Sequence, residues 1–227
     1  MTTETHYSAQ RIHRQMLRDR VRCEAYQAAL QRCINVGDVV LDFGAGTGLL
    51  SIFAAQAGAR KVYAVERTAI ADFARALVER NGLTALVEVI QADIEEVEAR
   101  EPVDVLVSEW MGGYGVDENL LAPLLLARDR WLRPGGTIVP ERVTAYLAPV
   151  FVEWLEEDRA RWRAQPYGVD LSPVAEGRAD EIYYGQHDIG PEQLVAAPEA
   201  MWTTETATES VERARQPYEA ALAFAAE

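Results

Sequence analysis

Residues 39–48, VVLDFGAGTG, decide the fold. A mostly apolar run is followed at once by glycines at every second position. Such a run is typical of a β-strand covered on both faces, as strands of a parallel sheet are. Glycines at the end of the strand let the backbone turn sharply and allow a ligand close to the main chain. The stretch therefore predicts a first strand, a ligand-binding turn and the start of a helix.

The sequence after this stretch alternates between apolar β runs and helical stretches. Alternation of this kind produces a parallel sheet with right-handed crossovers and helices on both faces. The predicted fold class is therefore α/β, with a doubly wound parallel sheet. The expected strands are 39–43, 61–66, 87–92, 103–108 and 137–140, and the expected helices are 49–57, 70–81 and 119–132.

The two ends of the chain differ from this core. The spacing of apolar residues predicts one amphipathic helix over residues 7–29. Near Pro140 the pattern changes, and we expect one more strand over 143–150 and a charged helix over 151–163. The Ala- and Glu-rich tail from Glu205 is expected to be helical.

Length and composition limit the possible classes of protein. A chain of 227 residues allows one domain, or one and part of a second. With 49% hydrophobic residues it can bury a full core, and its apolar runs are too short for a membrane span. The first twenty residues are polar and have no apolar stretch, so we expect no secretory signal. Cys23 and Cys33 have the spacing of neither a zinc site nor a disulfide scaffold, so we expect partly buried thiols in the cytoplasm.

The chain is acidic, with 22 Lys and Arg residues against 36 Asp and Glu residues and a formal net charge of −14. Nucleic acids and anionic membranes bind to basic patches, so neither is an expected partner. An acidic surface instead raises the local concentration of cationic ligands.

The glycine-rich turn indicates which cofactor to expect. A dinucleotide fingerprint needs a third glycine at position 49, where this chain has Leu49. The glycines at 44, 46 and 48, preceded by Asp42, instead resemble the pattern of S-adenosylmethionine-dependent methyltransferases. Glu66 ends the second strand, where a carboxylate can accept both ribose hydroxyls. The Ile94 amide and the Glu95 carboxylate are expected beside the adenine, although Glu95 equally fits a solvated helix start.

Glu109 and Glu118 bracket a glycine-rich loop after the fourth strand. Paired carboxylates point to acid/base chemistry, a metal or a cationic substrate. No His or Asp cluster supports a metal site. A planar guanidinium, with its fork of donors, matches two carboxylates best.

The motif SEWMG at 108–112, followed by a second Glu, resembles the double-glutamate loop of the protein arginine N-methyltransferase family. The resemblance extends over residues 7–200 and is strongest over 13–149. It implies that Arg22 pairs with the cofactor's methionine carboxylate and that Met16 packs beside the methyl group. Tyr7 resembles the last aromatic residue of the family's N-terminal motif.

The family resemblance implies a methyl transfer from S-adenosylmethionine to a guanidino nitrogen of arginine. It also implies a Rossmann-like sheet, a dimerisation arm over about 162–196 and therefore a homodimer. The expected parts are an N-terminal helical cap at 1–35, a cofactor domain at 36–142 and an abbreviated C-terminal region at 143–227. The candidate site residues are Glu109 and Glu118 for catalysis, Met16, Trp110 and Met111 for the substrate, and His13, Arg22, Asp42, Gly44, Gly46, Gly48, Glu66, Ile94 and Glu95 for the cofactor.

This sequence departs from the family in three ways. It has no Thr-His-Trp loop, it is too short for the family's β-barrel, and Gly113 and Asp117 replace bulkier loop residues. The missing barrel removes much of the groove that would hold a polypeptide, so free arginine or a small guanidino metabolite is expected as an acceptor, with protein arginine as the other option. Two alternatives stay open: a small-molecule methyltransferase with a non-guanidino nucleophile, and a dimeric cofactor-binding scaffold without turnover.

Overall fold

The computed structural model describes residues 10–112, 118–176, 189–217 and 222–223. The chain divides into two compact units. The first comprises Met1–Val143 and Thr204–Pro217, and the second comprises Thr144–Thr203 and Tyr218–Glu227. All the cavity-lining residues described below belong to the first unit.

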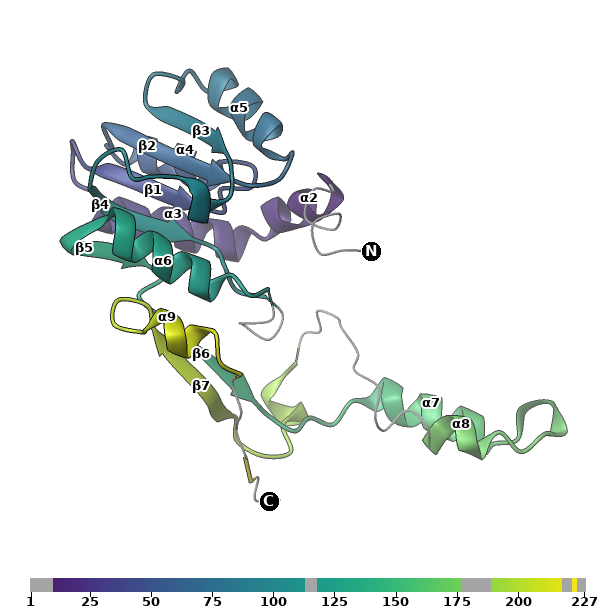
Figure 1. Cartoon of the computed structure of the whole chain (residues 1–227). Helices are drawn as coiled ribbons and strands as arrows, with labels where there is room; N and C mark the ends of the chain where they lie inside the picture. Colours follow the sequence, from purple (N-terminus) through teal and green to yellow (C-terminus); the bar gives the residue numbers. More distant parts are fainter. Residues whose placement is uncertain (1–9, 113–117, 177–188, 218–221, 224–227) are drawn as a thin grey trace. The chain divides into compact units, whose positions relative to one another are not determined.

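A five-stranded parallel sheet forms the centre of the first unit (Figure 1). Its spatial order is β3-β2-β1-β4-β5, so the chain moves outward from β1 to β3 and then continues on the other side of β1. This order confirms the doubly wound α/β fold. The strands are β1 (Val39–Phe43), β2 (Lys61–Glu66), β3 (Val87–Gln91), β4 (Val103–Ser108) and β5 (Leu132–Val139).

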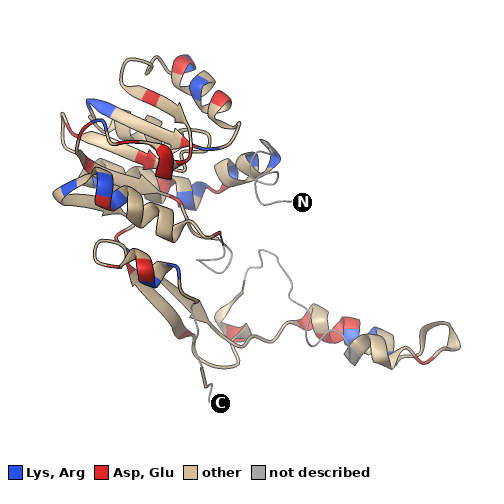
Figure 2. Ribbon diagram, viewed as in Figure 1, with Lys and Arg blue, Asp and Glu red and all other residues tan. Residues whose placement is uncertain are grey.

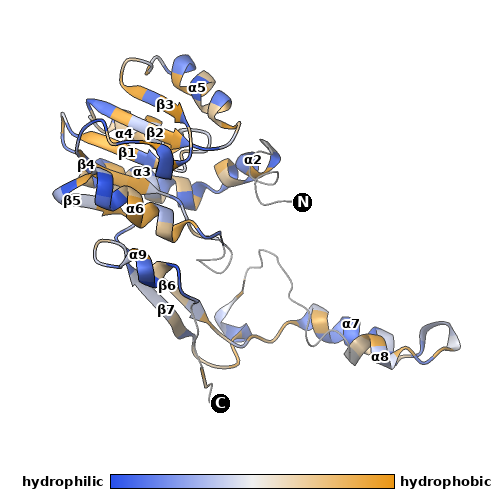
Figure 3. Cartoon of the chain, viewed as in Figure 1, coloured by the Kyte–Doolittle hydropathy of each residue, from blue (hydrophilic) through white to orange (hydrophobic). Residues whose placement is uncertain are grey.

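The two central strands, β1 and β4, lie where the strand order reverses, and they are apolar because helices cover both faces of the sheet. Every residue of β1 is buried, as is all of β4 except Asp104. Figure 3 shows the central strands as largely hydrophobic. In the view of Figure 1, α3 and α4 lie behind the sheet and α6 lies in front of it. The helices that follow the strands are α4 (Leu49–Gln56), α5 (Ala71–Arg80) and α6 (Leu121–Trp131).

The N-terminal segment forms two helices, α2 (Gln10–Arg18) and α3 (Arg20–Cys33). The prediction of one continuous helix was wrong at Asp19. The Asp19 side chain accepts a hydrogen bond from the Arg22 backbone N–H at 3.1 Å and so caps a new helix. This break gives α2 its own direction relative to α3.

The region after β5 contains a second sheet of two strands, β6 (Arg142–Leu147) and β7 (Glu199–Glu205). The predicted helical tail was wrong at its start, because Glu205 ends a strand. Trp202 and Thr204 are buried at alternate positions of β7, which is the period of a strand with one covered face. Within the described part of the tail, helix occurs only in α9 (Val211–Ala214).

The second unit contains α7 (Glu153–Arg163) and α8 (Ser172–Glu176). The charged helix predicted over 151–163 corresponds to α7, whose acidic residues are visible in Figure 2.

Short 3-10 helices occur in both units: η1 (Ile94–Glu96) in the first, and η2 (Pro166–Gly168) and η4 (Pro191–Gln193) in the second. No helix in the described ranges is long and apolar enough to cross a bilayer.

Candidate functional site

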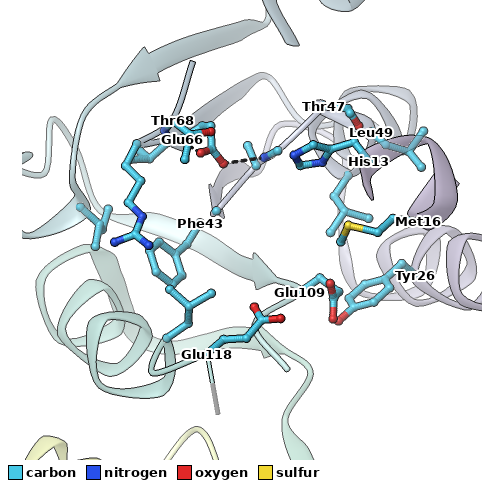
Figure 4. Close-up of a pocket in the computed structure, with 18 of the residues that line it drawn as sticks. His13, Met16, Tyr26, Phe43, Thr47, Leu49, Glu66, Thr68, Glu109 and Glu118 are labelled. Atoms are coloured by element: carbon cyan, nitrogen blue, oxygen red, sulfur yellow. Dashed lines mark hydrogen bonds between the residues drawn. The ribbon is translucent and has the colours of Figure 1, made fainter. Parts of the chain in front are cut away.

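A cavity of about 170 Å³ opens at the carboxyl ends of the parallel strands (Figure 4). Its walls come from the N-terminal helices, from the turns after β1 to β4 and from the start of α6. In a doubly wound sheet this is where ligands bind. The candidate residues that line it are His13, Met16, Arg22, Gly44, Gly46, Glu66, Ile94, Glu109 and Glu118.

The glycine-rich turn after β1 forms the floor of the cavity. The backbone N–H groups of Gly44 and Ala45 donate to the Val65 carbonyl at 2.9 and 3.0 Å, which fixes the turn against β2. Gly46 has a φ of +53°. A Cβ at Gly46 would lie 3.2 Å from His13 Cε1. Glycine is therefore favoured at position 46, because the positive φ strains other residues and because a Cβ would crowd the imidazole above it.

Glu66 is fixed by two backbone donors. Its Oε2 accepts the Gly46 N–H at 2.9 Å, and its Oε1 accepts the Thr68 N–H at 2.8 Å. The side chain is buried at the end of β2 and lines the cavity. Each carboxylate oxygen retains a lone pair for a further donor. This arrangement suits a ligand that presents two neighbouring hydroxyl groups, such as a ribose.

The helices α2 and α3 cover one side of the cavity. His13 and Met16 reach it from α2, and Arg22 reaches it from α3. Arg22 Nη2 donates to the Met16 carbonyl at 2.7 Å, which ties the two helices together across the break at Asp19. The remaining side of its guanidinium faces Glu109.

Glu109 and Glu118 line the same cavity, and Figure 4 shows both carboxylates pointing into it. Arg22 Nη1 lies 3.2 Å from Glu109 Oε2. Burial raises the pKa of the Glu109 carboxyl above its usual value, while Arg22 acts in the opposite direction and Glu118 adds to the rise. Two acids and one arginine therefore leave this end of the cavity suited to a further cation.

Five candidate residues do not line the cavity. Trp110, two residues after the end of β4, is fully buried in the core, as large apolar side chains often are. Asp42 is also fully buried, and its Oδ2 accepts the Ser51 hydroxyl at 2.6 Å. Burial raises the pKa of Asp42 to about 7. The other three are Gly48, Glu95 and Met111.

The adenine-binding role of Glu95 stays a prediction, because Glu95 is not among the residues that line the cavity. Its side chain is exposed, its N–H donates to Asp93 Oδ1 at 3.0 Å, and its carbonyl accepts Arg130 Nη1 at 2.7 Å. The capped turn matches the alternative of a solvated helix start. Ile94 beside it is buried and does line the cavity.

Three residues named in the sequence analysis, Tyr7, Gly113 and Asp117, lie outside the described residues. In the part of the chain that the structure describes, no group of three His, Cys, Asp or Glu side chains comes together as metal ligands would. Cys23 and Cys33 are free and half-buried, which confirms the expectation of partly buried thiols.

Sequence reasoning missed Tyr26 and Thr68. Tyr26 lines the cavity one helical turn after Arg22, and the four-residue spacing on an amphipathic helix was the signal that could have found it. Thr68 contributes a backbone N–H to Glu66, which no side-chain pattern reveals.

The doubly wound sheet, the glycine-rich turn after β1 and the acid that ends β2 together match the fold of class I S-adenosylmethionine-dependent methyltransferases. Comparison with known proteins agrees, because residues 40–136 match the family described as a methyltransferase domain.

Several arginine methyltransferases resemble this chain in sequence and structure. Protein arginine N-methyltransferase PRMT10 of Arabidopsis thaliana is 39% identical over 226 residues, covering 90% of this chain and 59% of that protein. Protein arginine N-methyltransferase 6 of Danio rerio is 46% identical over 171 residues, covering 73% and 49%. The solved Trypanosoma brucei PRMT1 enzyme–prozyme heterotetrameric complex with AdoHcy has a TM-score of 0.80 at 32% identity, covering 90% of this chain and 64% of that one.

Over the part of the relatives that it spans, the chain is similar to protein arginine N-methyltransferases in both sequence and fold. The solved structure of Arabidopsis thaliana protein arginine methyltransferase 10 is similar as well, with a TM-score of 0.75 at 37% identity and coverage of 92% and 66%. The chain spans about half to three fifths of the length of the curated relatives described above.

Proposed function

We propose that the protein transfers a methyl group from S-adenosylmethionine to a guanidino nitrogen of arginine, producing N-methylarginine and S-adenosylhomocysteine. The observation that carries this proposal is that Glu109 and Glu118 line one cavity with Glu66. The relatives in two organisms are named protein arginine N-methyltransferases, which supports the same reaction class.

The cavity residues fit the cofactor. Glu66, held by two backbone donors, would bind the ribose hydroxyls, and Arg22 would bind the methionine carboxylate. The turn at 44–48 brings backbone close to the ligand. The solved Trypanosoma brucei relative is a complex with AdoHcy. When bound, S-adenosylmethionine supplies an electrophilic methyl group on a sulfonium.

The protein's own contribution is to bind and orient the acceptor. A guanidinium is protonated at neutral pH and its lone pairs are delocalised, so it is a poor nucleophile in water. Glu109 and Glu118 would hold it so that its positive charge gathers on the nitrogens they bind, which leaves electron density on the nitrogen that attacks. One of the two glutamates accepts the proton that this nitrogen loses. Alignment in the cavity supplies much of the rate.

We propose that the protein acts in the cytoplasm and that two chains assemble through the second unit. Large apolar side chains are exposed on it, among them Tyr146, Phe151 and Tyr167. Exposed apolar side chains that gather into one patch often mark a protein–protein interaction site. A second copy is the partner we propose, and sedimentation at micromolar concentration should give twice the chain mass. A monomer at all concentrations would contradict the homodimer.

The substrate test uses S-adenosylmethionine with a labelled methyl group. Four separate reactions contain an Arg/Gly-rich peptide, free arginine, a small guanidino compound and a non-guanidino amine. We expect label on at least one of the three guanidino acceptors. Label on the amine alone would contradict the guanidino assignment and favour the other nucleophile class, and no label with intact cofactor binding would favour a scaffold.

A further inference from the structure

Tyr26 connects helix α3 to the strand that leads into the catalytic loop. Its hydroxyl donates to the Ser108 carbonyl, with an O–O distance of 3.1 Å. Ser108 is the last residue of β4, and Glu109 follows it directly. Tyr26 also lines the cavity, where Figure 4 shows it beside Glu109.

This hydrogen bond has a fixed polarity. Burial raises the pKa of Tyr26 well above its usual value, so its hydroxyl keeps its proton and acts as the donor. Ser108 is buried and pairs in register with Phe43 of β1. The tyrosine therefore holds a strand end that is already anchored on its other side.

Glu109 is thus restrained at two points. Arg22 contacts its carboxylate, and Tyr26, one helical turn further along α3, holds the backbone directly before it. We propose that Tyr26 is a positioning residue for the methyl-transfer reaction: its hydrogen bond to Ser108 and its ring beside Glu109 set the direction in which the Glu109 carboxylate faces the guanidinium. This inference rests on the proposed function.

A purely structural role would be shared by other buried tyrosines, and Tyr63 provides the matched control. Its hydroxyl donates to Glu101 Oε1 at 2.9 Å, so it makes one tyrosine–oxygen bond as Tyr26 does. Tyr63 is buried in the same unit but does not line the cavity. Replacing each tyrosine by phenylalanine removes one hydrogen bond, to a carboxylate at Tyr63 and to a backbone carbonyl at Tyr26, and only Tyr26 is beside Glu109.

The experiment compares Tyr26→Phe, Tyr63→Phe and the wild type. For Tyr26→Phe we expect kcat to fall about fivefold, which is what one lost hydrogen bond allows. The affinity for S-adenosylhomocysteine should stay within about twofold, because no cofactor contact is removed. Tyr63→Phe should keep the wild-type kcat, although its melting temperature should fall at least as much as that of Tyr26→Phe. Circular dichroism establishes for each variant the temperature range over which it is folded, and kcat is compared within the range that all three proteins share.

The pH dependence of kcat distinguishes a positioning role of Tyr26 from a simple loss of stability. The groups that face Glu109 are Arg22 and Tyr26 on α3, Asp19 before α3, Glu118, and the backbone N–H of Met111. Releasing the end of β4 lets water reach the carboxylate, which weakens the burial effect that raises its pKa. The acidic limb of kcat should therefore move to lower pH in Tyr26→Phe and stay in place in Tyr63→Phe.

The outcomes distinguish this inference from the function on which it rests. An active wild type with a Tyr26→Phe variant of equal kcat, or with an unmoved acidic limb, would overturn the positioning role alone. Equal losses of kcat in Tyr26→Phe and Tyr63→Phe would overturn it as well. A wild type that methylates none of the acceptors contradicts the proposed function and, with it, this inference.

Discussion

The two ends of the cavity hold their acids in different ways. At the cofactor end, both oxygens of Glu66 accept backbone N–H groups, and both donors lie near the strand ends that form the floor. At the acceptor end, Glu109 is paired with the side chain of Arg22, 87 positions earlier in the chain. The comparison shows that an acid held by backbone depends on local turns, whereas an acid held by side chains depends on the packing of a distant helix.

The largest expected effect is at the acceptor end. Glu109→Gln removes the negative charge that binds the guanidinium and accepts its proton, so kcat should fall by about 100-fold or more. Cofactor affinity should be kept, since Arg22 is then freed from its ion pair. Methyl transfer at saturating cofactor and acceptor measures this.

Two further variants calibrate the Glu109 result. Glu118→Gln should lose activity to a similar degree, because it faces the same cavity. Glu24→Gln alters an exposed acid on α3 and should leave kcat unchanged. Near-normal turnover of both loop variants would show that the paired acids are not the acceptor site.

The next effect is at the cofactor end. Glu66→Gln places an amide NH₂ where an acceptor is needed, opposite a backbone donor or a ribose hydroxyl. The KM for S-adenosylmethionine should rise by about tenfold to a hundredfold, the size of a lost charged hydrogen bond. At saturating cofactor, kcat should change far less. A fall in kcat without a change in KM would contradict the ribose assignment.

Asp42 tests how burial affects an acid that lies away from the cavity wall. Its pKa is raised from 3.8 to about 7, so between these values the folded protein keeps a proton that the unfolded chain releases. Stability attributable to Asp42 is therefore lost as the pH rises from about 4 to about 7.

Asp42→Asn removes this titration. Relative to the wild type, the variant should gain a few kcal/mol between pH 5 and pH 8, since each pKa unit corresponds to about 1.4 kcal/mol. Denaturant unfolding at the two pH values measures the difference. A difference that does not change with pH would mean that Asp42 ionises normally in the folded protein.

The smallest effect concerns an ion pair on the outer surface of α3. Arg20 and Glu24 are 2.7 Å apart, but their side chains are 84% and 60% exposed. Arg20→Ala should change the free energy of unfolding by less than about 0.5 kcal/mol and leave activity intact. Arg22→Ala, two residues along, should reduce both cofactor affinity and turnover. Equal effects of the two substitutions would remove the distinction between surface and site arginines.

The same comparison explains how much could be predicted from the sequence. The strands β1, β2 and β4 have the predicted bounds, because buried parallel strands are continuous apolar runs. Glu66 was recognisable from its place at the end of β2. The break at Asp19 and the strand ending at Glu205 were missed, since the first depends on a side-chain cap and the second on pairing with β6. Tyr26 and its bond to Ser108 depend on tertiary packing between distant segments.

The central claim is that the two ends of the cavity bind different molecules. Calorimetric titration of S-adenosylhomocysteine, followed by an Arg/Gly-rich peptide or free arginine, into the wild type, Glu66→Gln and Glu109→Gln tests it most directly. The account predicts that Glu66→Gln loses affinity for S-adenosylhomocysteine, whereas Glu109→Gln keeps it and loses affinity for the guanidino ligand. If Glu109→Gln loses S-adenosylhomocysteine as strongly as Glu66→Gln does, the claim is contradicted.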